Sequence, residues 1–439
     1  MQKYHIITYG CQMNVHESEK IAGMLVELGY ESVDAPELAD LIVFNTCCIR
    51  DNAEKRAYGN IGALKPLKKK NPNLMIAVVG CMTQQKNAGE ALLSKFPFVD
   101  IVLGTNSLDR LPVLLKEKRQ KRSMIAVCDD PTCDPNLELP VYRTSGTNAW
   151  VNIVYGCNNF CTYCIVPYVR GRERSRSASS VIADVRALVA EGYKEITLLG
   201  QNVDSYGSDL KDGTSFASLL EEVDAIPGQF RVRFMTSHPK DFDKRTVDVI
   251  AASRHICHNI HLPVQAGSDA VLKRMNRKYT VEQYLDIIEY IKGKMPDVGI
   301  TSDVMIGFPG ETEEDFLATC ELVKKVRFSN AFTFVYSPRK GTPAASMEQV
   351  SAAVKKSRIT RLVKLQNEIT KELSEGYIGG VYEVLIEDVN PKYPGTVCGR
   401  TDSGRLVTLP GDPELIGSFL SVKITKARSA ALFGEAVKE

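Results

Sequence analysis

Short apolar runs alternate with helical patterns in two separate stretches of the chain, and this alternation limits the folds that the chain can adopt. In the first stretch the apolar runs lie at residues 5–9, 41–44, 75–79 and 99–103. Helical patterns begin near residues 14, 52 and 107, and another runs through residues 91–92. Apolar strands separated by helices favour a parallel sheet covered on both faces. We therefore predict an α/β domain over residues 1–122.

The second alternation is longer. Its strand patterns lie at residues 150–155, 195–199, 230–234, 259–262, 300–306 and 331–336, and its clearest helical patterns lie at 281–291 and 313–326. Six strand and helix pairs are two short of a closed eight-stranded barrel, so we predict an open, partial (β/α)6 barrel over residues 149–376. Residues 123–148 contain Pro131, Pro135, Pro140 and Gly146, which is typical of an interdomain connection.

The C-terminal part changes period. A basic helical stretch begins near residue 345, and short strand patterns follow at 381–389, 395–400, 406–409, 419–426 and 431–437, separated by glycine and proline. Five short strands in this spacing predict a small β-barrel or sandwich over residues 377–439. The fold class expected for the whole chain is α/β, with this small β domain at the end.

Charge and composition exclude several classes of protein. The 439 residues include 55 Lys and Arg against 53 Asp and Glu, so the chain is not globally basic. No run approaches the roughly 18 apolar residues of a membrane helix, and the first residues lack a signal-peptide pattern. We expect a cytoplasmic protein without a membrane span. Twelve cysteines in such a chain indicate metal or redox chemistry rather than a disulfide framework.

Cys157, Cys161 and Cys164 form the strongest motif, directly after the first strand pattern of the second stretch. Three thiolates at this spacing fit on one loop and bind three irons of a 4Fe-4S cube, which leaves the fourth iron without a protein ligand. A zinc site usually needs a fourth Cys or His nearby, and the chain has six histidines in all.

A second set of cysteines is spread along the first stretch. Cys11, Cys47 and Cys81 each follow a predicted strand. The carboxyl ends of parallel strands lie along one edge of a sheet, where such folds bind ligands, so these thiols are expected to converge. Gly10 and Gly80 permit tight turns beside two of them. We predict a second 4Fe-4S site with one open iron; three unrelated buried thiols are the alternative.

Six cysteines have no assigned task. Cys48 is either an alternate ligand or a core residue, and Cys128 and Cys133 in the connection either pair or stay free. The patterns around the others place them in helices or strands, where buried small apolar residues are the default: Cys257, Cys320 and Cys398.

The loop of Cys157, Cys161 and Cys164 resembles the CxxxCxxC signature of the radical S-adenosylmethionine superfamily, and nearly the whole chain resembles the methylthiotransferases. The resemblance is carried by residues 10–14 (Gly-Cys-Gln-Met-Asn), 45–47, 79–81, 156–167 and 170–172, and the last five strands resemble the TRAM module, an RNA-binding β-barrel. Residues 10–14 and 236–239 (Thr-Ser-His-Pro) are most similar to the MiaB group, which acts on tRNA. The RimO group, which modifies a ribosomal protein, more typically reads Gly-Cys-Pro-Lys-Asn at the first of these motifs.

This resemblance implies insertion of a methylthio group at carbon 2 of N6-isopentenyladenosine at position 37 of certain tRNAs. It implies two 4Fe-4S clusters and two S-adenosylmethionine molecules, one supplying the methyl group and the other the radical. It also implies partners: tRNA, an electron donor such as flavodoxin or ferredoxin, and a sulfur donor. Tyr163 is expected beside the adenine of the cofactor, with Gln265, Ser268 and Gly307 nearby. Read without the resemblance, Tyr163 packs within its loop, and the other three lie in ordinary strand-to-helix turns, with Thr312 as an N-cap.

RNA binding rests on local patches. Four arginines follow the radical loop and are expected near its rim, where a phosphate backbone would pass: Arg170, Arg172, Arg174 and Arg176. Lys65, Lys68, Lys69, Lys70 and the run 116–122 are more typical of solvated helix ends. The C-terminal domain is slightly acidic, so its RNA role rests on the resemblance, with candidate contacts from Arg400, Arg405, Lys423, Lys426 and Arg428.

The sequence is also compatible with two other functions. A relative acting on threonylcarbamoyl-adenosine tRNA or on a ribosomal protein is the nearer alternative, and a non-catalytic, metal-bearing RNA-binding protein is the more distant one. The sequence leaves open which tRNAs are used, the reductant, the sulfur source and the oligomeric state, for which a monomer is the simplest expectation.

Overall fold

The computed structural model describes residues 1–48, 51–117, 123–127, 139–143, 146–429 and 431–437, without the side chains of 51–53. Cys128 and Cys133 lie outside the described residues. The chain forms two compact units. The first comprises Met1–Thr144, Tyr155–Asn158 and Cys164–Arg174, and the second comprises Ser145–Val154, Asn159–Tyr163 and Ser175–Glu439. Each unit is described by itself.

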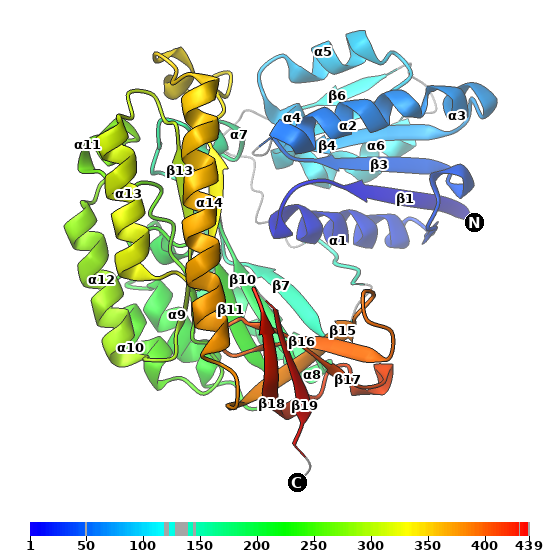
Figure 1. The fold of residues 1–439 in the computed structure, drawn as a ribbon. Helices are drawn as coiled ribbons and strands as arrows, with labels where there is room; N and C mark the ends of the chain where they lie inside the picture. The colour runs from blue at the N-terminus through cyan, green and yellow to red at the C-terminus, as the bar shows by residue number, and fades with distance from the viewer. Residues whose placement is uncertain (49–50, 118–122, 128–138, 144–145, 430, 438–439) are drawn as a thin grey trace. The chain divides into compact units, whose positions relative to one another are not determined.

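The first unit contains a six-stranded parallel sheet in the order β2-β1-β3-β4-β5-β6 (Figure 1). Its strands are β1 (Gln2–Thr8), β2 (Tyr30–Ser32), β3 (Leu41–Thr46), β4 (Met75–Gly80), β5 (Ile101–Gly104) and β6 (Met124–Ala126). Its main helices are α1 (Gln12–Glu27), α2 (Asp51–Ala63), α3 (Lys65–Lys70), α4 (Cys81–Gln84), α5 (Ala88–Lys95) and α6 (Leu111–Glu117). The predicted parallel α/β architecture is confirmed.

Two edge strands were not predicted. β2 and β6 have three residues each, which is too short for an apolar run to stand out, and they add to the sheet by parallel pairing with β1 and β5. β6 lies inside residues 123–148, so that segment is not a simple connection.

Both faces of this sheet are covered. Ile21 and Leu25 of α1 and Leu111 of α6 belong to one buried cluster, whereas Ile61 of α2 and Leu92 of α5 belong to another. Strand residues alternate between the two clusters because successive side chains point to opposite faces. Helices therefore bury both faces of the sheet, and the carboxyl ends of its strands lie along one edge.

The second unit begins with a six-stranded open barrel made of two parallel sheets, β11-β10-β7 and β12-β13-β14. Its strands are β7 (Asn148–Asn152), β10 (Glu195–Leu199), β11 (Arg231–Met235), β12 (Asn259–His261), β13 (Gly299–Ile306) and β14 (Asn330–Val335). The chain also forms a short two-stranded sheet of β8 (Val154–Tyr155) and β9 (Arg174–Ser175). The helices of the second unit are α8 (Ala178–Ala190), α9 (Phe216–Asp224), α10 (Lys244–Ala252), α11 (Asp269–Arg274), α12 (Val281–Lys294), α13 (Glu313–Val326) and α14 (Ala352–Glu375). The short helix α7 (Val166–Val169) belongs to the first unit.

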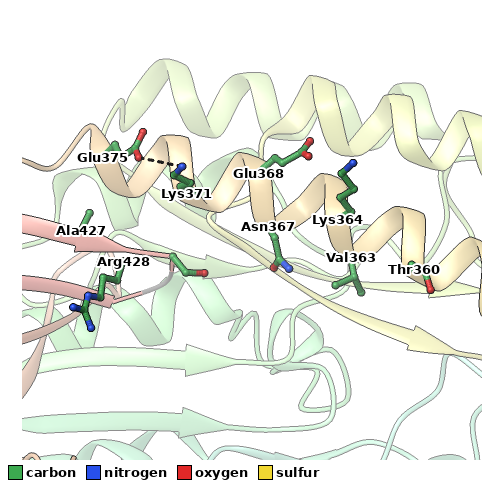
Figure 2. Close-up of a pocket in the computed structure, with 10 residues that line it drawn as sticks. Thr360, Val363, Lys364, Asn367, Glu368, Lys371, Glu375, Ala427 and Arg428 are labelled. Atoms are coloured by element: carbon green, nitrogen blue, oxygen red, sulfur yellow. Dashed lines mark ion pairs between the residues drawn. The ribbon is translucent and has the colours of Figure 1, made fainter. Parts of the chain in front are cut away.

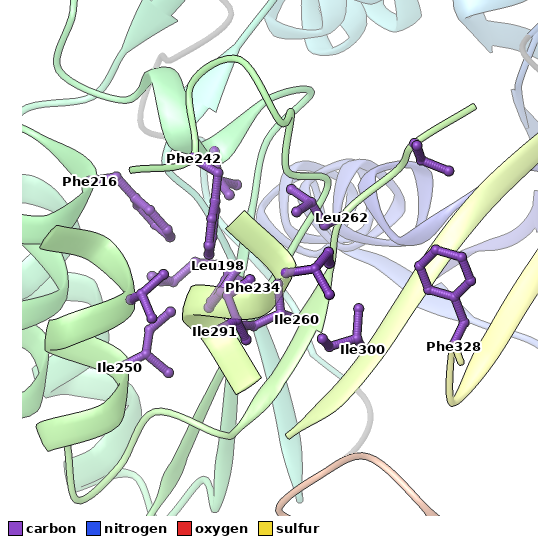
Figure 3. Close-up of a cluster of buried hydrophobic side chains, with 14 of the residues drawn as sticks. Leu198, Phe216, Phe234, Phe242, Ile250, Ile260, Leu262, Ile291, Ile300 and Phe328 are labelled. Carbon is purple, nitrogen blue, oxygen red and sulfur yellow. The ribbon is translucent and has the colours of Figure 1, made fainter. Parts of the chain in front are cut away.

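Four helices of the second unit, α8, α10, α12 and α13, begin at polar N-cap residues. Ser177, Asp243, Thr280 and Thr312 are N-caps whose side chains accept a hydrogen bond from the backbone three residues on. The predicted N-cap at Thr312 is thus confirmed. The outer face of the strands packs against the helices in one large apolar cluster, which includes Leu198, Phe234, Ile260 and Ile300 (Figure 3).

The last five strands form the predicted closed barrel, in the order β15-β16-β17-β19-β18. They are β15 (Val381–Val389), β16 (Thr396–Thr401), β17 (Leu406–Pro410), β18 (Phe419–Arg428) and β19 (Ala431–Ala436). This barrel is fixed to the amino ends of the open-barrel strands. Arg231 donates to the carbonyl of Arg400 at 2.7 Å, and Arg233 donates to that of Thr401 at 2.9 Å.

Among the helices that the structure describes, none combines the length and the apolar character needed to cross a membrane.

Candidate functional site

Cys11, Cys47 and Cys81 lie at the carboxyl edge of the first sheet. They follow β1, β3 and β4, which are direct neighbours in the sheet. Thr46 is in register with Gly80, so Cys47 and Cys81 leave the sheet side by side. The predicted placement of the three cysteines at adjacent strand ends is therefore observed.

Two glycines allow the chain to turn at these ends. Gly10 and Gly80 have φ values of +124° and +107°, which side chains rarely tolerate. A Cβ at position 10 would lie 2.7 Å from Cβ of Cys47, and one at position 80 would lie 2.3 Å from the carbonyl oxygen of Thr46. The two turns thus bring the loops of the cysteines close together.

Asn14 and Asn45 tie the loops to each other. The amide of Asn45 donates to the carbonyl of Asn14 at 2.7 Å and to Oγ of Ser18 at 3.0 Å. The amide of Asn14 lies 3.3 Å from the carbonyl of Thr46. Both asparagines are buried. They lie in the motifs at residues 10–14 and 45–47, and they hold the turns that carry Cys11 and Cys47.

Cys48 lies in the same buried cluster as Cys81, together with Ile165 and Val169. A hydrogen bond with Cys48 is the largest influence on the Cys81 thiol and lowers its pKa, whereas the pKa of Cys48 is raised by that bond and by burial. Cys81 is therefore the member of this pair that is more readily a thiolate, the form that binds iron.

Arg170 is buried beside these cysteines. Its Nη1 lies 2.8 Å from Oε1 of Glu17, and both side chains are 2% exposed. Burial acts to lower the pKa of Arg170, but Cys81, Glu17 and Cys11 raise it well above its usual value. The prediction that Arg170 offers a rim contact for RNA is wrong, because its guanidinium is held inside the first unit.

The other three arginines of that group differ in exposure. Arg172 is exposed. Arg174 donates to the carbonyl of Arg170 at 3.0 Å, and Arg176 pairs with Asp184 at 2.8 Å. Of the C-terminal candidates, Arg405 is buried and donates to the carbonyl of Ser329, so it is not an RNA contact.

Hydrogen bonds fix individual residues of the radical loop. The amide of Cys157 donates to the carbonyl of Gly171 at 3.1 Å within the first unit. In the second unit, Arg277 is buried and directs its Nη1 to Sγ of Cys161 at 3.5 Å. Its Nη2 donates to the carbonyl of Pro263 at 2.9 Å, so the guanidinium is fixed where it stabilises a thiolate.

His238, in the motif at residues 236–239, lies near Arg277. Its ring is edge-on to Tyr279, with centroids 5.7 Å apart. Burial, followed by the charges of Arg277 and Lys240, lowers its pKa to about 2, so the ring is neutral. Nδ1 accepts from the amide of Lys240 at 3.2 Å, which leaves the proton on Nε2.

The structure places the predicted cofactor contacts in the second unit. Tyr163 is edge-on to Phe308, with centroids 6.4 Å apart. Gln265, four residues after β12, and Gly307, directly after β13, have φ values of +70° and +68°, so both lie in tight turns. The hydroxyl of Ser268 is bonded to Asp315.

The thiols have the chemistry that iron-sulfur ligation needs, since all six proposed ligands are free cysteines. Within the described ranges, no three Cys, His, Asp or Glu side chains are arranged closely enough to hold a metal ion. Sγ of Cys11 faces Oδ1 of Asn14 at 3.6 Å.

A groove of about 570 Å³ lies elsewhere, between α14 and the end of β18 (Figure 2). It is lined by charges of both signs, among them Lys364, Lys371, Glu368, Glu375 and Arg428. Lys371 and Glu375 are paired at 3.8 Å. With its charges nearly balanced and none of the cysteines in its lining, this groove is not the reaction site.

Two buried residues near the cysteines, Glu17 and Arg277, were not predicted from the sequence. Glu17 lies one turn before Ile21 on the buried face of α1. A carboxylate on an apolar helix face needs a buried partner, so its position could have predicted an ion pair. Arg277 gave no comparable signal, because it follows the basic residues Lys273 and Arg274.

Comparisons with known proteins agree with this arrangement. A model of the Radical SAM superfamily matches residues 151–323, a model of the uncharacterized protein family UPF0004 matches residues 3–104, and a model of the TRAM domain matches residues 375–437. A curated protein of Clostridium botulinum (strain Langeland), named tRNA-2-methylthio-N(6)-dimethylallyladenosine synthase, is 51% identical over 436 residues, or 99% of this chain and 97% of its own. A protein of the same name from Acetivibrio thermocellus is 49% identical over 438 residues, or 99% of this chain and 91% of its own.

The chain belongs to this synthase family. As a family member it is a radical S-adenosylmethionine transferase, and its cofactors are S-adenosylmethionine and two 4Fe-4S clusters. The fold is also found in a solved structure of much lower sequence identity. The radical S-adenosylmethionine methyltransferase TsrM of Kitasatospora setae matches with a TM-score of 0.59 at 14% identity, covering 87% of this chain and 78% of its own.

Proposed function

We propose that this chain inserts a methylthio group at carbon 2 of N6-isopentenyladenosine, also called N6-dimethylallyladenosine, at position 37 of tRNAs. The observation that carries the proposal is the second set of thiols, Cys11, Cys47 and Cys81 at three adjacent strand ends, in a chain that also has the radical loop. Relatives that are about half identical over nearly the full chain are named for this reaction, which supports the proposed substrate.

The roles of individual residues belong to the same proposal. Cys157, Cys161 and Cys164 would hold the cluster that binds S-adenosylmethionine, and Cys11, Cys47 and Cys81 would hold the auxiliary cluster. Bound at these positions, the clusters and S-adenosylmethionine supply the radical, the methyl group and the sulfur for the reaction. Tyr163, Gln265, Ser268 and Gly307 remain the proposed neighbours of S-adenosylmethionine.

The protein's own residues would prepare both sites. Arg277 donates to Cys161, and a hydrogen bond to a cluster thiolate stabilises the reduced cluster. Arg170 offsets negative charge beside Cys81 and Cys11. The neutral His238 offers a donor at Nε2 near Arg277. Together these residues stabilise charge at positions where water has little access.

We further propose that the enzyme works in the cytoplasm, where tRNA is found, with a flavodoxin or ferredoxin as electron donor and a separate sulfur donor. Arg172 is the exposed member of the arginine group that follows the radical loop, and we propose that it contacts the RNA backbone.

The test uses two stem-loop RNAs, one with N6-dimethylallyladenosine and one with threonylcarbamoyl-adenosine at the same position. The reconstituted enzyme is incubated anaerobically with S-adenosylmethionine and reductant, and the nucleosides are analysed by mass spectrometry. We expect the methylthio product from the first RNA alone. Product from the second RNA alone would assign the chain to the other substrate class.

A further inference from the structure

The inner face of the open barrel carries polar and aromatic side chains that stay accessible. On β13, Thr301, Asp303 and Met305 are partly buried, whereas the residues between them are buried on the outer side with the helices. Ile300, the residue before Thr301, belongs to this outer cluster and is labelled in Figure 3. Because side chains alternate along a strand, Thr301, Asp303 and Met305 face the interior.

Neighbouring strands extend this inner face. His261 on β12 is in register with Thr301, and Phe332 and Phe334 on β14 are in register with Asp303 and Met305. Residues paired in register on parallel strands point to the same side of the sheet. His261, Phe332 and Phe334 therefore also face the barrel interior.

The polar part of this face is fixed by contacts. Nδ1 of His261 lies 2.9 Å from Oγ1 of Thr301, and its Nε2 lies 3.7 Å from Oδ2 of Asp303. The ring of His261 is edge-on to that of Phe332, with centroids 5.9 Å apart and an interplanar angle of 71°. The imidazole of His261 therefore contacts both the polar residues and Phe332.

Phe332 and Phe334 are unusually open for the interior of a barrel, with exposures of 49% and 42%. Barrel interiors are normally filled by packed side chains. β14 is the last strand of its sheet, so both rings lie at the open side of the barrel. They are two residues apart, roughly 7 Å along the strand. We call this pair the inner aromatic wall.

We propose that the inner aromatic wall holds the substrate base, with its dimethylallyl arm, while His261 and Asp303 bond polar edges of that nucleoside. The proposal rests on the proposed function. A flat base stacks on aromatic faces, and an apolar arm is stabilised by the same rings. The apolar arm distinguishes this occupant from S-adenosylmethionine, which has a charged methionine part and no such arm. An extruded base would also need such a pocket, because the reacting carbon is inaccessible in a stacked loop.

The test measures the dissociation constants of two stem-loop RNAs that differ in the dimethylallyl group alone. The reconstituted protein with S-adenosylmethionine is titrated anaerobically, with Phe332→Ala, Phe334→Ala and Asp303→Asn as variants. Leu317→Ala is the matched control, since Leu317 is an exposed apolar residue of α13 in the same unit. Production of 5′-deoxyadenosine without RNA reports on the cofactor site.

We expect the wild type and the control to prefer the dimethylallyl RNA. Each Phe→Ala change should weaken binding of that RNA by about 5- to 150-fold, as expected for a lost stacking contact. Binding of the unmodified RNA should change less, and 5′-deoxyadenosine production should not change. An unaltered preference in both Phe variants would overturn the proposal, as would equal binding of the two RNAs by the wild type. A parallel loss of 5′-deoxyadenosine would assign the wall to the cofactor instead. Failure of the proposed function is distinguished by the absence of methylthio product from the wild type.

Discussion

Replacing Arg170 by methionine removes the cation that faces Glu17 inside the first unit. Both side chains are 2% exposed, and their charged atoms are 2.8 Å apart. Removing one partner of such a pair leaves an uncompensated buried charge and costs about 3–5 kcal/mol. Because 1.36 kcal/mol corresponds to a factor of ten, we expect the protection of the surrounding backbone amides to fall roughly 150- to 5,000-fold.

Hydrogen exchange followed by mass spectrometry measures this loss directly in the full chain. The peptides to follow are those of α1, which carries Glu17, and of α7, which precedes Arg170. Arg172→Met is the matched control, because Arg172 is exposed and two residues away. We expect it to change the free energy of unfolding by about 0.5 kcal/mol or less.

The double variant Arg170→Met, Glu17→Met separates charge from packing. An apolar pair of similar volume often replaces a buried ion pair without net cost. We therefore expect the double variant to recover most of the protection lost in Arg170→Met. A single variant within about 1 kcal/mol of the wild type, or a double variant that loses the sum of both single changes, would refute the reasoning.

Three further predictions follow from the two sets of thiols and their turns. Cys157→Ala should abolish 5′-deoxyadenosine production while the auxiliary cluster stays visible by electron paramagnetic resonance; retained production would remove the radical role of that loop. Cys47→Ala should keep 5′-deoxyadenosine production but give no methylthio product, as judged by nucleoside mass analysis, and a normal yield would contradict the convergence of the three strand ends. Gly80→Ala should destabilise the first unit by more than about 2 kcal/mol in hydrogen exchange, because its Cβ would meet the carbonyl oxygen of Thr46 at 2.3 Å. Gly29→Ala, with a left-handed φ but open space around its Cβ, should cost only about 1 kcal/mol.

The positions of the cysteines were predictable because they follow from period and topology. Parallel strands place their carboxyl ends along one edge, so spacing along the chain was enough to bring Cys11, Cys47 and Cys81 to neighbouring strands. The five strands of the C-terminal barrel were predictable for a similar reason, since glycine and proline mark each turn.

The burial of the arginines could not be predicted in the same way. A cluster of cations near a reactive loop suggests RNA, but burial depends on a partner far away in the chain. Arg170 is paired with Glu17, 153 positions earlier, and Arg231 and Arg233 reach carbonyls of the C-terminal barrel. Such contacts depend on tertiary packing, so local sequence patterns do not predict them.

The most direct measurement is the iron content and Mössbauer spectrum of the anaerobically reconstituted protein, compared with two triple alanine variants. One variant lacks Cys11, Cys47 and Cys81, and the other lacks Cys157, Cys161 and Cys164. The wild type should contain about eight irons as two 4Fe-4S clusters, and each triple variant should keep about four. Full iron content in either variant, or tetrahedral zinc in the wild type, would contradict the assignment of one cluster to each set of thiols.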